Sequence, residues 1–155
     1  HGKRTGSTAA VLTIKDELAT IVNIGDSRIY RIRNNNIEQL SIDHTRAHQM
    51  IEAGLISMEA AQNNALNHVL TQHLGVPPNE YVIEPYICKN ISVQNGDLFL
   101  LCSDGLTEML SVDEIETILK RNENTKAIAE ELVDKSLKAG GKDNISVIVV
   151  KIESK

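Results

Sequence analysis

Three aspartates share one setting, since each lies in a turn beside an apolar run that is typical of a strand. The turns are Gly25-Asp26-Ser27, Ser103-Asp104-Gly105 and Gly141-Lys142-Asp143-Asn144. Two follow a strand-like run and one precedes it, so the carboxylates can meet at one end of a sheet if the strands are neighbours. Carboxylates without Cys or His companions favour a hard cation, Mg²⁺ or Mn²⁺, over zinc. Such a cation keeps several waters, and one of these can become a nucleophile.

Of the three aspartates, Asp104 has the position at which an unpaired carboxylate would be most costly to bury. It follows the run 98–102 (LFLLC), which is typical of a strand buried on both faces. A carboxylate at the end of a buried strand is costly to desolvate unless it is paired or coordinated. The alternative is that Asp104 only bonds to nearby backbone N–H groups, and that all three aspartates lie in ordinary surface turns. Spacing alone leaves both alternatives open.

Composition narrows the class of protein. The chain has 155 residues, of which 41% are hydrophobic, which predicts one globular domain rather than a disordered chain. Its net charge is −5 and no basic cluster occurs, so we expect no nucleic acid and no membrane as a partner. Cys88 and Cys102 lie in apolar runs, which predicts buried thiols in a reducing compartment. No signal peptide or membrane-length apolar run is seen, and we expect a cytoplasmic protein.

The elements that must position the aspartates follow from apolar periodicity and turn residues. Strands are predicted at 6–14, 18–24, 28–33, 37–40, 81–93, 98–102 and 145–152. The first four are expected to form one antiparallel meander. Helices are predicted at 43–53, just after Ser57, after a capping box of Ser111 and Glu114, and at 125–138. This order predicts an α+β domain in which sheets and helices form layers.

Several motifs occur together and in a specific order. They include NIGDSRIY (23–30), DLFLLCSDGLTEML (97–110) and GGKDNISVIVV (140–150), with GSTAAV, SIDHT, MIEAGLIS and VLTQHLG between or before them. This set resembles the bacterial branch of the type 2C metal-dependent serine/threonine protein phosphatases. The resemblance implies a layered α-β-β-α sandwich of mainly antiparallel sheets flanked by helices. It also implies hydrolysis of phosphoserine and phosphothreonine in proteins by a metal-activated water, without a phospho-enzyme.

The resemblance also implies roles for individual residues. Asp104 and Asp143 would ligate the first metal, and Asp26 with Asp104 would hold an accessory ion. The intact domain would bind about two to three ions of Mg²⁺ or Mn²⁺. Five residues would support the site by shaping its turns: Gly25, Ser103, Gly105, Gly141 and Asn144. The segment 45–67 would be a mobile flap that influences which phosphoprotein, such as a substrate of a Ser/Thr kinase, is accepted.

The chain departs from the family's pattern at the N-terminus, in the flap and just after the flap. An early acidic motif and an Asp-Gly-x-Gly-Gly motif, which precede Gly6 in the family, are absent here. We therefore expect residues 1–155 to form roughly the last two-thirds of the domain. The N-terminal strands and helix would be missing, and activity of the isolated chain would be negligible. The uncovered sheet edges would favour a dimer.

In the flap, Asn67 stands where this branch often has arginine, and Asn64-Ala65 where it often has His-Pro; after the flap, Gln72 also stands where arginine is frequent. These changes and the missing motifs motivate an alternative function. The chain would then be a non-catalytic regulatory or interaction module on a phosphatase scaffold. The remaining histidines, among them His44 and His48, show no spacing typical of a ligand set and are expected to be solvated helix residues.

Overall fold

Two antiparallel sheets lie face to face in the computed structural model, which describes residues 5–62, 65–77, 79–121 and 124–153. The three-stranded sheet has the order β1-β2-β5, with β1 at Ala9–Lys15, β2 at Leu18–Ile24 and β5 at Tyr86–Ser92. The four-stranded sheet has the order β4-β3-β6-β7. Its strands are β3 (Arg28–Arg33), β4 (Asn36–Gln39), β6 (Leu98–Cys102) and β7 (Val147–Lys151).

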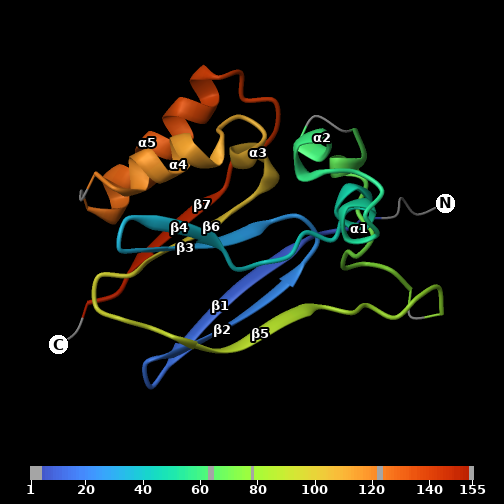
Figure 1. Cartoon of the computed structure of the whole chain (residues 1–155), viewed down its shortest axis with the longest axis horizontal. Coiled ribbons are helices and arrows are strands. Elements are labelled where there is room, and N and C mark those ends of the chain that lie inside the picture. Colours follow the sequence, from blue (N-terminus) through green and yellow to red (C-terminus); the bar gives the residue numbers. More distant parts are fainter. Residues whose placement is uncertain (1–4, 63–64, 78, 122–123, 154–155) are drawn as a thin grey trace.

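Three helices cover the outer face of the four-stranded sheet (Figure 1): α3 (Asp104–Thr107), α4 (Val112–Leu119) and α5 (Thr125–Lys138). The predicted capping box is present at the start of α4, where Ser111 and Glu114 bond to each other's backbone N–H groups. The main core lies between this sheet and the helices. Its fully buried residues include Tyr30, Leu100, Leu106, Ile115, Ile118, Ile128 and Leu132.

The outer face of the three-stranded sheet carries no helix among the described segments (Figure 1). Val11, Val22 and Ile87 are directly paired across its strands and share that face. Val11 is 44% exposed and Ile87 is 47% exposed. The second helical layer of the predicted sandwich is therefore not formed by the described part of the chain.

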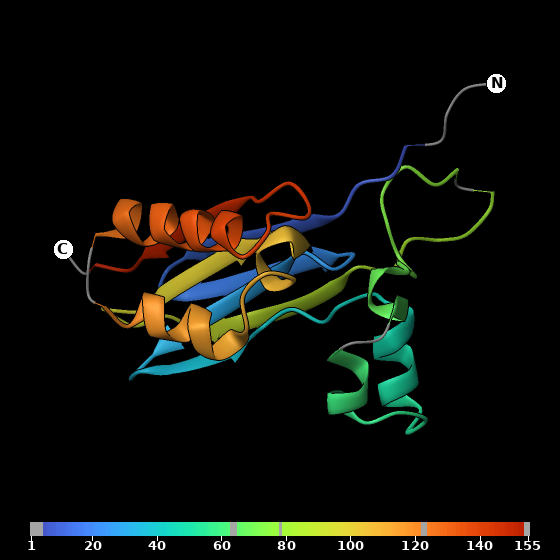
Figure 2. The same cartoon turned by 90° about the horizontal axis from the view of Figure 1, so that it is seen from above.

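The remaining helical turns form a small group beside one end of the sheets, as the two views in Figures 1 and 2 agree. They are α1 (Arg46–Glu52), α2 (Met58–Gln62) and the 3₁₀ turn η1 (Ala65–His68). Thr45 caps α1, because its Oγ1 accepts a hydrogen bond from the His48 amide at 3.2 Å. This group corresponds to the predicted flap. Residues 63 and 64, which belong to the same prediction, lie outside the described residues.

The predicted α+β class and its layered antiparallel sheets are confirmed, but two details are wrong. The first four strands are not one meander, because β1 and β2 lie in one sheet and β3 and β4 in the other. Gly25 has a φ of +93°, which lets the chain leave the first sheet and enter the second. The stretch Ser103-Asp104-Gly105 is not a simple turn, because Asp104 begins α3 directly after β6.

Other differences concern single elements. β5 begins at Tyr86 rather than at 81, and its Asn90 has a φ of +58° close to a register shift against β2. Cys88 and Cys102 are both free thiols, and Cys102 is buried. Within the described ranges, no helix has the length and apolar character needed to cross a bilayer.

Candidate metal centre

The three predicted aspartate turns lie at one end of the four-stranded sheet. At this end Cys102 of β6 pairs with Arg28 of β3 on one side and with Val147 of β7 on the other. Asp26 stands just before β3, Asp104 just after β6, and Asp143 shortly before β7. Because neighbouring strands are antiparallel, the start of β3, the end of β6 and the start of β7 coincide. In Figure 1, α3 and the predicted flap also lie at this end.

Ser103 joins the end of β6 to the loop before β7. Its amide donates to the Ser146 carbonyl at 3.1 Å, while its Oγ accepts from the Ser146 amide at 3.0 Å and donates to the Asn144 carbonyl at 3.1 Å. Gly105 packs directly behind this junction, since a Cβ there would lie 2.4 Å from the Asn144 carbonyl oxygen. The first turn of α3 therefore rests on the backbone of residues 143–144.

Local hydrogen bonds orient two of the carboxylates. Asp104 Oδ1 accepts from the Gly105 amide at 2.9 Å, and Asp143 Oδ1 accepts from the Asn144 amide at 2.6 Å. Gly141, with a φ of +51°, donates its amide to the Ser136 carbonyl at 3.1 Å and so ends α5. The hydrogen bonds of Asp104 and of Asp143 within the described residues go to Oδ1, which leaves Oδ2 of each carboxylate for a ligand role.

Asp26 lies in an electrostatically unfavourable position. Burial and, next in importance, the Asp104 carboxylate raise the pKa of Asp26 from 3.8 to about 6. Arg28, two residues further along, is engaged elsewhere, because it donates to Asp43 Oδ1 at 3.1 Å, to Asp43 Oδ2 at 2.8 and 2.6 Å, and to the Tyr30 hydroxyl at 3.2 Å. The Asp26–Asp104 pair is therefore an acidic pair that a bound cation would relieve.

The donor set of this pair fits a hard divalent cation that completes its coordination with water. However, the described residues contain no group of three or more His, Cys, Asp or Glu side chains that could hold a metal ion. The structure has Asp26 and Asp104 at the same end of the paired strands β3 and β6, and it brings the backbone of Asp143 against α3. That the three aspartates bind metal stays a prediction.

Two residues that hold the Asp26 turn were not recognised from the sequence. Asn23 is fully buried, and its Nδ2 donates to the Ser27 carbonyl at 2.9 Å and to the Gly25 carbonyl at 3.4 Å. His44 is not a solvated helix residue as predicted, because it precedes α1 and its Nδ1 accepts from the Gly25 amide at 3.1 Å. Burial lowers the pKa of His44. An asparagine at an inward position of β2 was the one available signal for such a turn.

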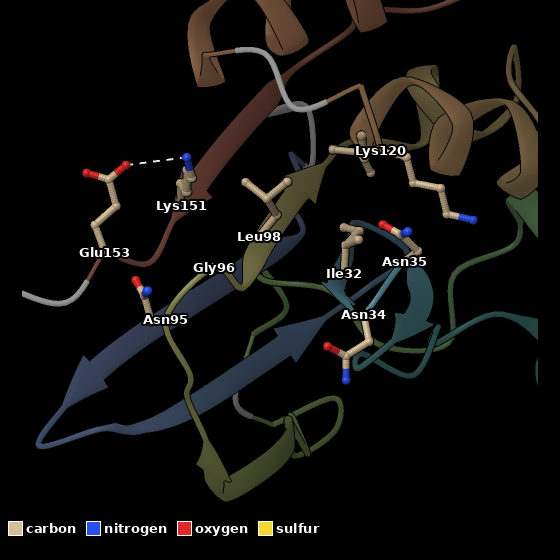
Figure 3. A pocket seen from close by; sticks show the side chains of 10 residues that line it. Ile32, Asn34, Asn35, Asn95, Gly96, Leu98, Lys120, Lys151 and Glu153 are labelled. Carbon is tan, nitrogen blue, oxygen red and sulfur yellow. Dashed lines mark ion pairs between the residues drawn. The ribbon is translucent and has the colours of Figure 1, made fainter.

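Two cavities differ in their relation to this centre. One of about 580 Å³ lies between residues 5–8 and the segment 68–81, next to the Asp26 turn, where Thr8 Oγ1 and Ser27 Oγ are 2.8 Å apart. A larger one of about 950 Å³ lies at the opposite end of β6 (Figure 3), and its lining includes Lys120 and Lys151. The larger cavity contains none of the three aspartates, so size does not identify the site.

Comparison with known proteins defines the class of protein. The family model described as "Protein phosphatase 2C" matches residues 2–139, so the chain belongs to the protein phosphatase 2C family. The serine/threonine phosphatase stp of Listeria welshimeri is 35% identical over 145 residues, which are 94% of this chain and 56% of that protein. The chain thus spans little more than half the length of this curated relative.

Solved structures agree with this assignment. The serine/threonine phosphatase PstP/Ppp of Mycobacterium tuberculosis superposes with a TM-score of 0.88 at 29% identity, over 96% of this chain and 61% of that one. The catalytic domain of the phosphatase PstP in complex with two manganese ions gives a TM-score of 0.83 at 28% identity, over 96% and 60%. The predicted family and fold are therefore confirmed.

Proposed function

We propose that this chain is the C-terminal, metal-binding part of a protein phosphatase that hydrolyses phosphoserine and phosphothreonine. The observation that carries the proposal is the pairing of β3, β6 and β7, which puts Asp26, Asp104 and Asp143 at the same end of the sheet. Membership of the protein phosphatase 2C family supports it.

The proposed cofactor is Mg²⁺ or Mn²⁺, and the manganese in the PstP structure supports a divalent ion. When bound, such an ion supplies Lewis-acid chemistry toward a phosphoryl oxygen and lowers the pKa of water. Asp26 and Asp104 would hold one ion together, and Asp143 would add a carboxylate beside Asp104. The chain's other residues orient these ligands: Asn23 and His44 fix the Asp26 turn.

The proposed substrate is a phosphoprotein, such as one modified by a Ser/Thr kinase. The described parts of the flap, residues 45–62 and 65–67, lie beside the sheet end that carries the aspartates, which supports a role for the flap in substrate choice (Figure 2). The proposal includes a cytoplasmic location, which the two free thiols support.

The test is a metal-dependent assay of the intact protein that contains this chain. We expect turnover of p-nitrophenyl phosphate and of a phosphothreonine peptide with Mn²⁺, and its loss on Asp104→Ala. The matched control is Asp134→Ala, which removes an exposed carboxylate on α5 and should leave the rate unchanged. The 155-residue chain alone should show negligible turnover. The proposal fails if the intact protein has no metal-dependent activity, or if Asp104→Ala retains it.

A second candidate is a non-catalytic interaction module, and the environments of Asn67 in the flap and Gln72 after it favour it. Asn67 donates its side-chain amide to the Ala61 carbonyl, and Gln72 Oε1 accepts from the Glu84 amide at 3.3 Å. Both side chains bond within the chain at positions where the resemblance would place arginine, which argues against phosphopeptide binding by the flap. Binding of a phosphopeptide by the intact protein without turnover would establish this alternative.

A further inference from the structure

His44 makes two hydrogen bonds to the same residue of the Asp26 turn. Its Nδ1 accepts from the Gly25 amide at 3.1 Å, and its own amide donates to the Gly25 carbonyl at 2.9 Å. Both polar backbone groups of the residue before Asp26 are therefore bound by one residue. Because Nδ1 accepts a hydrogen bond, the imidazole is neutral and carries its proton on Nε2.

Gly25 is also confined on its other side. A Cβ at Gly25 would lie 2.3 Å from the Thr8 methyl group, and Thr8 in turn bonds to Ser27 at 2.8 Å between their hydroxyl oxygens. The turn is thus held between β1 and His44. Thr8 holds Gly25 by close packing, and His44 holds its other side by hydrogen bonds. Loss of the bond from the Gly25 amide to His44 Nδ1 would therefore loosen the turn on the His44 side.

The same short stretch is bonded to the segment that follows η1. The His44 carbonyl accepts from the Thr71 amide at 2.8 Å, and the Arg46 amide donates to the Val69 carbonyl at 2.9 Å. Thr45 forms an isolated bridge with Leu70 and also caps α1. Residues 44–46, at the start of the predicted flap, therefore connect the Asp26 turn to residues 69–71, just beyond its end.

We propose that His44 is a positioning residue, which fixes the Asp26 turn for metal binding and couples its position to residues 69–71. The metal-binding part rests on the proposed function, whereas the coupling rests on the hydrogen bonds alone. His44 acts through Gly25 and does not itself touch substrate. The consequence is that movement of the predicted flap changes the geometry at Asp26.

A matched pair of substitutions in the 155-residue chain tests this role. His44→Asn keeps an acceptor near the position of Nδ1, whereas His44→Leu has a similar size and shape without the acceptor. His48→Leu, four residues further on, is the control for loss of a histidine on α1. Three readouts apply: imidazole ¹⁵N chemical shifts of the unmodified chain, amide hydrogen exchange at Gly25 and Thr71, and binding of Mn²⁺ by calorimetry.

The unmodified chain should show the His44 tautomer with its proton on Nε2. His44→Leu should speed exchange at both Gly25 and Thr71 by about tenfold, the effect of losing one hydrogen bond. It should also weaken Mn²⁺ binding by about tenfold, at the low end for residues that orient a ligand. His44→Asn should stay within about threefold of the unmodified chain in both measurements.

Several results would overturn the proposal. A proton on Nδ1 in the unmodified chain, or unchanged exchange at Gly25 in His44→Leu, removes the positioning role. Faster exchange at Gly25 with unchanged exchange at Thr71 removes the coupling. If the unmodified chain does not bind Mn²⁺, the metal site of the proposed function fails, while the tautomer and exchange measurements still decide the role of His44.

Discussion

Asp26→Asn should stabilise the metal-free chain at neutral pH. Burial, together with the Asp104 carboxylate, raises the pKa of Asp26 from 3.8 to about 6. Ionising Asp26 therefore costs the folded chain about 3 kcal/mol more than the unfolded chain, since a pKa difference of one is worth about 1.4 kcal/mol. Asp26 is only half-buried, and solvent screening reduces the expected gain to about 2 kcal/mol. Asparagine keeps the shape of the side chain and removes the charge.

The sign of the pH dependence follows from the raised pKa. Below pH 3.8, the ordinary pKa of Asp26, the carboxyl group is protonated in both the folded and the unfolded chain, and its contribution to stability is complete. This contribution is lost as the pH rises through about 6, the pKa of Asp26 in the folded chain. The difference in unfolding free energy between Asp26→Asn and the unmodified chain should therefore grow from pH 4 to pH 7 and then level off. Urea denaturation followed by circular dichroism, with EDTA present, measures this difference at each pH.

The control for this prediction is Asp134→Asn, which removes an exposed carboxylate and should show no such growth with pH. Adding Mn²⁺ should reverse the ranking, because a cation that binds only the folded state stabilises the unmodified chain more than the variant. A difference that is independent of pH, or a variant less stable than the unmodified chain at pH 7, would show that the Asp26–Asp104 repulsion is not as described.

Three further predictions concern packing and assembly. Gly105→Ala should cost about 1–3 kcal/mol of unfolding free energy and weaken Mn²⁺ binding, because its Cβ meets backbone. Gly96→Ala, at the opposite end of β6, is the control: its φ of +88° makes alanine strained there, but calorimetric titration with Mn²⁺ should show unchanged metal binding. Arg28→Lys should cost about 2 kcal/mol in urea denaturation, because lysine cannot make the two-pronged contact with Asp43. The chain should dimerise through a sheet edge at high concentration, and Val11→Lys on edge strand β1 should yield a monomer by light scattering.

Periodicity and capping residues predicted most elements of the fold. β2, β3, β6 and α5 have the predicted bounds, because apolar runs and caps act over a few residues. The assignment of strands to sheets could not be obtained this way. Ile29 and Ile32 point to opposite faces of β3 and are both buried, since the other sheet covers one face and the helices cover the second. Only the tertiary structure reveals that double coverage.

For the candidate site too, some features could be predicted from the sequence and others could not. The adjacency of Asp26 and Asp104 was predicted from turns at strand ends, and the electrostatic interaction between these residues agrees with it. The role of His44 could not be predicted, because its partner Gly25 is a backbone group nineteen residues earlier and leaves no mark in side-chain spacing. No group of three or more candidate ligands was found among the described residues, so the metal-binding role of the three aspartates stays a prediction.

The crossing from β2 to β3 has a mechanical consequence. Only three residues, Gly25–Ser27, join strands that belong to different sheets. The two sheets therefore cannot shear along the strand direction without rotating the backbone dihedrals of this tripeptide. Asp26 is its central residue, so sliding one layer over the other changes the backbone conformation on both sides of that carboxylate.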